Sequence, residues 1–274
     1  MTTQSLPTSF TLLIGPPRSG TTLIANAFMS HPKVSGVMEP YQRRRQTTIG
    51  STDVDAFLAE NQNDLADMAR RPDLAMKETT TRLANVEMSL DLMRGFATRG
   101  IYTGLIIILR CPFAAFLSQV EASSEMWAER KLTEATGATF NRWINAQREA
   151  LRHLAYHARA QHLRLISYEA FCANPGSELA RLMALVPVDA HPDQLKFAPP
   201  KTMVRGGDPK TVAKSGHISV SDRDADIQTF MEEVKMVDNF RFAIALRAMV
   251  LNDVCVDPDQ VVIDRLTRLL ILGA

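Results

Sequence analysis

The segment that most constrains the fold is the run TLLIGPPRSGTTLIANAF, from Thr11 to Phe28. It begins with an apolar stretch, breaks into a loop rich in glycine and proline, and continues at once into an apolar helical pattern. This order predicts a strand, a loop and a helix, with the loop at the helix N-terminus. Free backbone N–H groups and the positive end of the helix dipole meet there, and they suit a phosphate or sulfate group.

The same loop has the spacing of a nucleotide-binding P-loop but lacks its lysine. Four residues separate Gly15 from Gly20, and Thr21 stands where the lysine would follow. A nucleoside triphosphatase without that lysine loses its main cation for the terminal phosphates. We therefore expect the loop to bind a phosphate group other than that of an ordinary nucleoside triphosphate.

Short apolar runs alternate with helical patterns along the chain. The runs with strand character are Phe10–Gly15, Val34–Met38, Leu74–Lys77, Leu105–Arg110 and Leu163–Tyr168. Between them, helical stripes of apolar residues run from Leu83 to Ala97 and from Phe140 to Ala158. The alternation predicts βαβ units and a mostly parallel sheet in an α/β fold. Ligands bind beyond the carboxyl ends of such strands, so the loop, Arg110 and the segment after Met38 are expected to share one cleft.

Beyond about Gln194 the pattern changes to a stretch rich in proline, glycine and lysine without clear periodicity. Two helices follow, around Phe240–Leu251 and Pro258–Leu270. We expect their apolar residues to pack on the rest of the protein. The predicted organisation is one domain over residues 1–274, with a core over about 10–219 and C-terminal helices over about 226–274.

Composition argues against several classes of protein, among them bulk electrostatic binders of nucleic acid or membranes and disulfide-stabilised proteins. A hydrophobic content of 46% and a charged content of 22% are ordinary for a globular protein. The formal net charge of +1 argues against bulk electrostatic binding to nucleic acid or to an anionic membrane. The three cysteines are scattered, so no disulfide framework or thiolate metal site is implied. The first residues lack the pattern of a signal peptide and no apolar run approaches ~20 residues, so we expect a cytoplasmic protein without a membrane span.

Four segments carry a family resemblance: PPRSGTTL, LIIILRCPFAAFLSQ, LRLISYEAFCANPGSELARL and GGDPKTVAKSGHIS. In this order they resemble four elements of the sulfotransferases that use 3'-phosphoadenosine 5'-phosphosulfate (PAPS). These elements are the 5'-phosphosulfate loop, the 3'-phosphate element, the strand with its Tyr-Glu pair and proline-led helix, and the glycine-rich loop that closes over the nucleotide. The resemblance covers roughly Phe10 to Ser219.

The resemblance implies a three-layer fold of the P-loop NTPase type and a defined donor. The enzyme would transfer a sulfuryl group from PAPS to an acceptor and release adenosine 3',5'-bisphosphate (PAP), without a metal. Arg18 would replace the missing P-loop lysine, and Arg110 and Ser118 would hold the 3'-phosphate. The implied donor-binding residues are Pro17, Arg18, Ser19, Gly20, Thr21, Thr22, Arg110, Ser118, Arg205 and Lys210.

Sulfuryl transfer also needs a base that removes the acceptor's proton. Cytosolic family members use a histidine after a strand-end lysine, whereas here Lys77 is followed by Glu78. Glu39, in VMEPY, resembles the Glu-Pro of the bacterial and carbohydrate-type branch. We favour Glu39 as the base, with Glu78 as the alternative and Lys77 at the bridging oxygen. Two other interpretations stay open: Glu39 paired only with a nearby arginine (Arg43 or Arg44), and Lys77 as a surface or ion-paired lysine.

Two other function classes remain. A nucleotide or small-molecule kinase predicts Mg-dependent ATP binding and a carboxylate at a strand end, but the strand from Leu105 ends in Arg110. A non-catalytic PAP-binding protein is the second alternative. The acceptor (saccharide, glycolipid, peptide tyrosine, or small phenol or alcohol), the role of Arg43–Arg45 and a homodimer stay open. Trp143 is expected in the core, and no metal site is expected at His153 and His157.

Overall fold

Five strands form one parallel sheet. The computed structural model describes residues 6–43, 52–125, 134–158, 162–186, 188–196, 223–254 and 259–272. The strands are β1 (Ser9–Gly15), β2 (Val34–Met38), β3 (Asp73–Thr79), β4 (Tyr102–Leu109) and β5 (His162–Ser167). They lie in the order β2-β3-β1-β4-β5, and each neighbouring pair is parallel. The predicted parallel α/β sheet is confirmed, and its central strand is β1, which leads into the glycine-rich loop.

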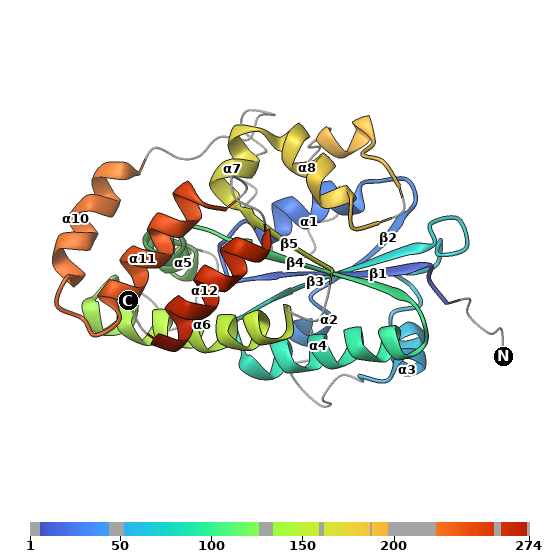
Figure 1. Ribbon diagram of the computed structural model, residues 1–274, viewed down its shortest axis with the longest axis horizontal. Coiled ribbons are helices and arrows are strands. Elements are labelled where there is room, and N and C mark those ends of the chain that lie inside the picture. The colour runs from blue at the N-terminus through green and yellow to red at the C-terminus, as the bar shows by residue number, and fades with distance from the viewer. Residues whose placement is uncertain are drawn as a thin grey trace.

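Helices cover both faces of this sheet (Figure 1). They are α1 (Thr21–Met29), α2 (Pro40–Arg43), α3 (Val54–Glu60), α4 (Leu83–Thr98), α5 (Pro112–Glu125), α6 (Gly137–Ala158), α7 (Tyr168–Ala173), α8 (Pro175–Met183), the 3-10 helix η1 (Pro192–Leu195), α10 (Asp224–Val234), α11 (Phe240–Asn252) and α12 (Asp259–Leu272). In Figure 1, α1, α7 and α8 lie on one side of the strands, and α4 and α6 lie on the other. This is the expected three-layer arrangement.

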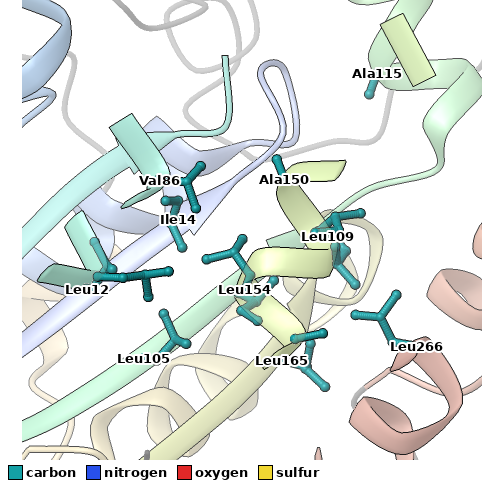
Figure 2. Packing of buried hydrophobic residues seen from close by; sticks show 14 of the residues in the cluster. Leu12, Ile14, Val86, Leu105, Leu109, Ala115, Ala150, Leu154, Leu165 and Leu266 are labelled. Atoms are coloured by element: carbon teal, nitrogen blue, oxygen red, sulfur yellow. The ribbon is translucent and has the colours of Figure 1, made fainter. Parts of the chain in front are cut away.

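The alternation of side chains along β1 explains the three layers, because successive strand residues point to opposite faces. Leu12 and Ile14 belong to one buried cluster with α4 and α6, whereas Leu13 belongs to a second cluster with α1 and α8. Figure 2 shows Leu154 of α6 among the sheet residues of the first cluster. Each leucine or isoleucine buried in this way stabilises the fold by about 2 kcal/mol.

Three strand ends differ from the sequence prediction. β4 ends at Leu109, before Arg110, because Pro112 opens α5. β5 ends at Ser167, whose side chain accepts a hydrogen bond from the Ala170 N–H (3.0 Å) and caps α7. β3 continues two residues beyond Lys77, because its pairing with β1 extends to Thr79. Lys77 is therefore inside the strand rather than at its end.

The C-terminal helices pack against the core, as predicted. Phe230 of α10 stacks on Phe116 of α5 with 5.5 Å between ring centroids. Leu266 of α12 and Leu246 of α11 belong to the same buried cluster as the sheet residues. The sequence pattern predicts α11 and α12 with approximate bounds, whereas α10 is identified only in the structure. Across the described parts of the chain, no helix combines the length and apolar character needed to span a bilayer.

Candidate active site

The loop after β1 makes a close turn before α1. Gly20, the N-cap of α1, has a φ of 77°, and a Cβ there would lie 2.2 Å from a ring carbon of Tyr168. Both the left-handed backbone and this contact require glycine. Since glycine has no side chain, the N-cap itself leaves the first N–H groups of α1 without a side-chain cap. These N–H groups and the helix dipole are the elements that hold an anion at a helix N-terminus.

Backbone strain marks the same region. Among the residues that the structure describes, two that are not glycine have a positive φ: Arg18 (66°) and Glu39 (50°). A left-handed conformation costs roughly 1–2 kcal/mol for such a residue, and it persists only where the surroundings hold it. Strained residues of this kind cluster at functional sites. Both of them are residues that the sequence suggests for donor binding or catalysis.

The segment after β4 contacts the loop directly. Arg110 follows β4, and its Nη1 donates a hydrogen bond to the Arg18 carbonyl oxygen (2.9 Å). The Arg18 Nε donates to the Ser118 Oγ of α5 (3.1 Å). The structure thus brings Arg18, Arg110 and Ser118 together, although they come from segments about 100 residues apart in the sequence.

Two buried polar atoms near this contact bear on the fit of a phosphate group. The Ser19 Oγ and the Arg110 Nε have no hydrogen-bond partner within the described part of the protein. A buried donor left unpaired costs about 1–3 kcal/mol, and an anion that accepts hydrogen bonds would remove that cost. A hydroxyl, a guanidinium and a helix N-terminus make a donor set that fits a phosphate or phosphosulfate.

An ion pair lies across the neighbouring strands. The Lys77 Nζ of β3 contacts the Glu39 Oε1 just after β2, and the Glu39 N–H donates to the Lys77 carbonyl oxygen (2.7 Å). The Lys77 side chain is 1% exposed and that of Glu39 is 20% exposed. Lys77 is therefore buried and not a surface lysine, whereas its interpretation as an ion-paired lysine is confirmed. Glu39 is paired with Lys77, while Arg44 and the Arg43 side chain lie outside the described residues.

Glu78 lies beside this pair but on the other face of β3. Its Oε1 accepts from the Thr79 N–H (2.9 Å) and its Oε2 from the Tyr41 N–H (3.3 Å). The residue has no exposed surface. Burial raises the pKa of Glu78 to about 7; the Thr79 N–H and the Lys77 ammonium oppose that rise, and the Glu39 carboxylate adds to it. Both carboxylate oxygens are thus committed to backbone groups.

The order of the strands places these groups around the loop. β1 lies between β3 and β4, and the Thr80 N–H donates to the Gly15 carbonyl oxygen (3.0 Å). The Lys77–Glu39 pair is therefore on one side of the loop, and Arg110 is on the other. All of them lie at the carboxyl end of the sheet, where ligands of open α/β sheets bind.

No protein-family model matches the chain, and no curated protein matches it. The sulfotransferase domain of the Synechococcus PCC 7002 olefin synthase is similar in structure, with a TM-score of 0.54 and 13% identity over 97% of this chain and 95% of that one. Mouse sulfotransferase SULT7A1 complexed with PAP has a TM-score of 0.48 and 14% sequence identity, over 88% of this chain and 90% of that one. A sulfotransferase from Alicyclobacillus acidocaldarius has a TM-score of 0.46 and 12% sequence identity, over 85% of this chain and 95% of that one.

The chain has a sulfotransferase fold. The likeness to the Synechococcus domain covers almost the whole of both chains and agrees with the five-stranded parallel sheet flanked by helices. At 13% identity the likeness shows the fold and not the chemistry. The roles of individual residues therefore depend on the geometry of this chain's own site.

Tyr168 and Glu169 are site neighbours to which the sequence reading assigns no chemistry. The Arg110 guanidinium lies over the Tyr168 ring, 4.4 Å from its centroid, and the same ring packs against Gly20. Burial raises the pKa of the Tyr168 hydroxyl. The Glu169 Oε1 accepts from the Cys111 N–H (3.0 Å), and burial raises the pKa of this carboxyl too. These contacts arise because β4 and β5 are neighbours in the sheet, and a single sequence does not show which strands are neighbours.

A small cavity of about 70 Å³ adjoins Arg110. Glu169 and two further arginines, Arg223 and Arg247, line it. Acidic and basic side chains thus line the same cavity. Burial raises the pKa of Glu169, and Coulomb attraction from Arg110 and Arg247 opposes that rise. The cavity extends the polar surroundings of Arg110 toward α10 and α11.

Several residues named from the sequence are not placed. Arg205, Lys210, Arg44 and Arg45 lie outside the described residues, as does the His157 side chain. Trp143 is buried in the core, as predicted. Within the described parts, no three histidine, cysteine or acidic side chains gather in a way that would hold a metal ion.

Proposed function

We propose that the protein is a sulfotransferase that moves a sulfuryl group from PAPS to a hydroxyl or amine of an acceptor. The observation that carries the proposal is the strained loop at Arg18 with its contacts to Ser118 and Arg110, in a sulfotransferase fold. These contacts join the two segments that resemble the 5'-phosphosulfate loop and the 3'-phosphate element. We also propose that residues 1–274 act as one domain.

The donor would be held from two sides. The loop residues Pro17, Ser19 and Gly20 and the start of α1 at Thr21 and Thr22 would offer N–H and hydroxyl donors to the 5'-phosphosulfate. Arg18 would supply the cation that the P-loop lysine supplies elsewhere. Arg110 and Ser118 would bind the 3'-phosphate, which distinguishes PAPS from ATP. Arg205 and Lys210 remain further candidates for the same phosphate.

Glu39 is the proposed base. Its side chain is partly exposed at the carboxyl end of the sheet, on the β3 side of the loop. From there its carboxylate would accept the acceptor's proton as the acceptor oxygen or nitrogen bonds to sulfur. Lys77 holds that carboxylate by the ion pair and would stabilise charge on the bridging oxygen. The Glu-Pro sequence here favours the carbohydrate-type branch, with a saccharide or glycolipid acceptor.

Selective loss of PAP binding tests the donor assignment. Replacing Arg110 with alanine should weaken PAP binding about 10- to 100-fold, the value of a charge-assisted hydrogen bond, and leave AMP binding nearly unchanged. The control is Arg94→Ala, which removes an exposed arginine of α4. Calorimetric titration measures both ligands. Equal losses for PAP and AMP would remove Arg110 from the 3'-phosphate site.

A further inference from the structure

The turn between β2 and α2 carries the proposed base on strained backbone. β2 is at the edge of the sheet and ends at Met38, Glu39 takes the left-handed conformation, and α2 begins at Pro40. The Glu39 N–H is held by the Lys77 carbonyl oxygen. Because α2 has only four residues, its own hydrogen bonds do little to fix this turn.

Glu78 supplies a second attachment for the turn. One carboxylate oxygen accepts from Thr79 in its own strand, and the other accepts from Tyr41 in α2, two residues after Glu39. The carboxylate therefore bridges the carboxyl end of β3 and the start of α2. It has no exposed surface, so it is not placed to touch an acceptor.

We propose that Glu78 is a positioning residue, whose buried carboxylate anchors the Glu39–Pro40–Tyr41 turn and thereby keeps Glu39 against Lys77 at the cleft. This inference rests on the proposed function in one respect, that Glu39 is the base. The adjacent carboxylates then have separate roles. Glu39 meets the acceptor, and Glu78 holds the backbone that carries Glu39.

The anchor depends on protonation. The charged groups that face Glu78 are Lys77 on its own strand and Glu39 from the turn, and burial raises its pKa to about 7. An ionised carboxylate accepts from both N–H groups, whereas protonation converts one oxygen into a donor. The hold on the turn should weaken as pH falls below about 7.

The test compares Glu78→Gln with the wild-type protein. Glutamine keeps the shape and one carbonyl acceptor but replaces the other oxygen with a donor. The expected result is at least tenfold faster hydrogen exchange at the Tyr41 amide and a roughly tenfold lower kcat, with PAP affinity within twofold of wild type. In the wild type kcat should rise as pH increases through about 7, and this rise should be absent in Glu78→Gln. Glu87→Gln, an exposed change on α4, is the matched control.

Two results would overturn the anchor. The first is unchanged Tyr41 exchange in Glu78→Gln, and if kcat then falls more than a hundredfold, Glu78 is itself the base. If the variant does not fold, exchange in the wild type decides. Tyr41 protection, corrected for the intrinsic rate, should then fall as pH drops through 7, and a flat profile contradicts the proposal. Absence of sulfuryl transfer by the wild type would refute the proposed function and leave the exchange result intact.

Discussion

The Lys77–Glu39 pair shows how single residues build one side of the candidate site. Lys77 is almost fully buried, and a buried ammonium needs an ionised partner. Glu39 meets that need while keeping part of its carboxylate exposed, because its left-handed backbone turns the chain directly after β2. Backbone strain and ion pairing thus hold one carboxylate at the carboxyl end of the sheet.

Replacing Glu39 with glutamine should remove the base and spare the donor site. We expect kcat to fall by about a hundredfold or more, the usual contribution of general-base catalysis, with PAP affinity within twofold of wild type. Turnover with an acceptor found by screening, together with calorimetry on PAP, measures the two effects. Full turnover by a Glu39→Gln protein that binds PAP normally would exclude Glu39 as the base.

Glu78 should make stability depend on pH. Its folded-state pKa of about 7 exceeds the ordinary value of 4.5, so the folded protein keeps a proton there that the unfolded chain releases. The resulting stabilisation is complete below pH 4.5 and is lost as pH rises through 7. Between pH 5 and 8, wild type should lose roughly 2–3 kcal/mol relative to Glu78→Gln.

Urea unfolding of both proteins across this pH range measures the difference. Above pH 7 the folded protein would keep Glu78 ionised, so that it accepts from both N–H groups, and this lowers the stability of the fold. Such a loss of stability is common at residues that serve function. Stability curves that stay parallel from pH 5 to 8 would show that Glu78 titrates at its ordinary pKa in the folded protein.

At the scale of elements, α12 is fastened to the far edge of the sheet by its first residue. The Asp259 Oδ1 accepts from the Leu165 N–H of β5 (2.7 Å) and from the Arg181 Nη1 of α8 (3.1 Å). Arg164 of β5 adds an ion pair at 3.5 Å. One partly buried carboxylate therefore joins α12, β5 and α8, and it lies outside the set of residues assigned to the donor.

Removing this carboxylate should weaken the fold without changing nucleotide binding. Asp259→Ala removes the acceptor of the Leu165 N–H and the carboxylate that pairs with Arg164 and Arg181, and we expect a loss of about 2 kcal/mol in the free energy of unfolding. Asp264→Ala on the same helix should cost less than about 0.5 kcal/mol. Denaturant unfolding measures both. A shift in PAP affinity in Asp259→Ala would mean that α12 contributes to the donor site.

Elements were also the level at which the sequence was most informative. All five strands, the loop at Arg18 and the helices α1, α4 and α6 follow from apolar periodicity and from glycine and proline, because these are local signals. Element ends were harder, since pairing with β1 carries β3 past Lys77. The contacts of Tyr168 depend on which strands are neighbours, and local patterns do not encode that.

At the scale of the whole molecule, the strand order makes the site. Because β1 lies between β3 and β4, the loop after it separates the proposed base from the residues proposed to bind the 3'-phosphate. The residue types of the candidate site could be predicted from the sequence. The left-handed backbone of Glu39, its pairing with Lys77 and the anchoring by Glu78 could not, because each depends on β2 and β3 lying side by side.

A 3'-phosphorylated nucleotide is the ligand that we propose for the site around Arg18 and Arg110. Calorimetric titration with PAP, and with ADP plus Mg²⁺ for comparison, tests it most directly. We expect tight binding of PAP without Mg²⁺ and no response to ADP. Binding of ADP that requires Mg²⁺, with no binding of PAP, would contradict it and favour a kinase with an altered P-loop.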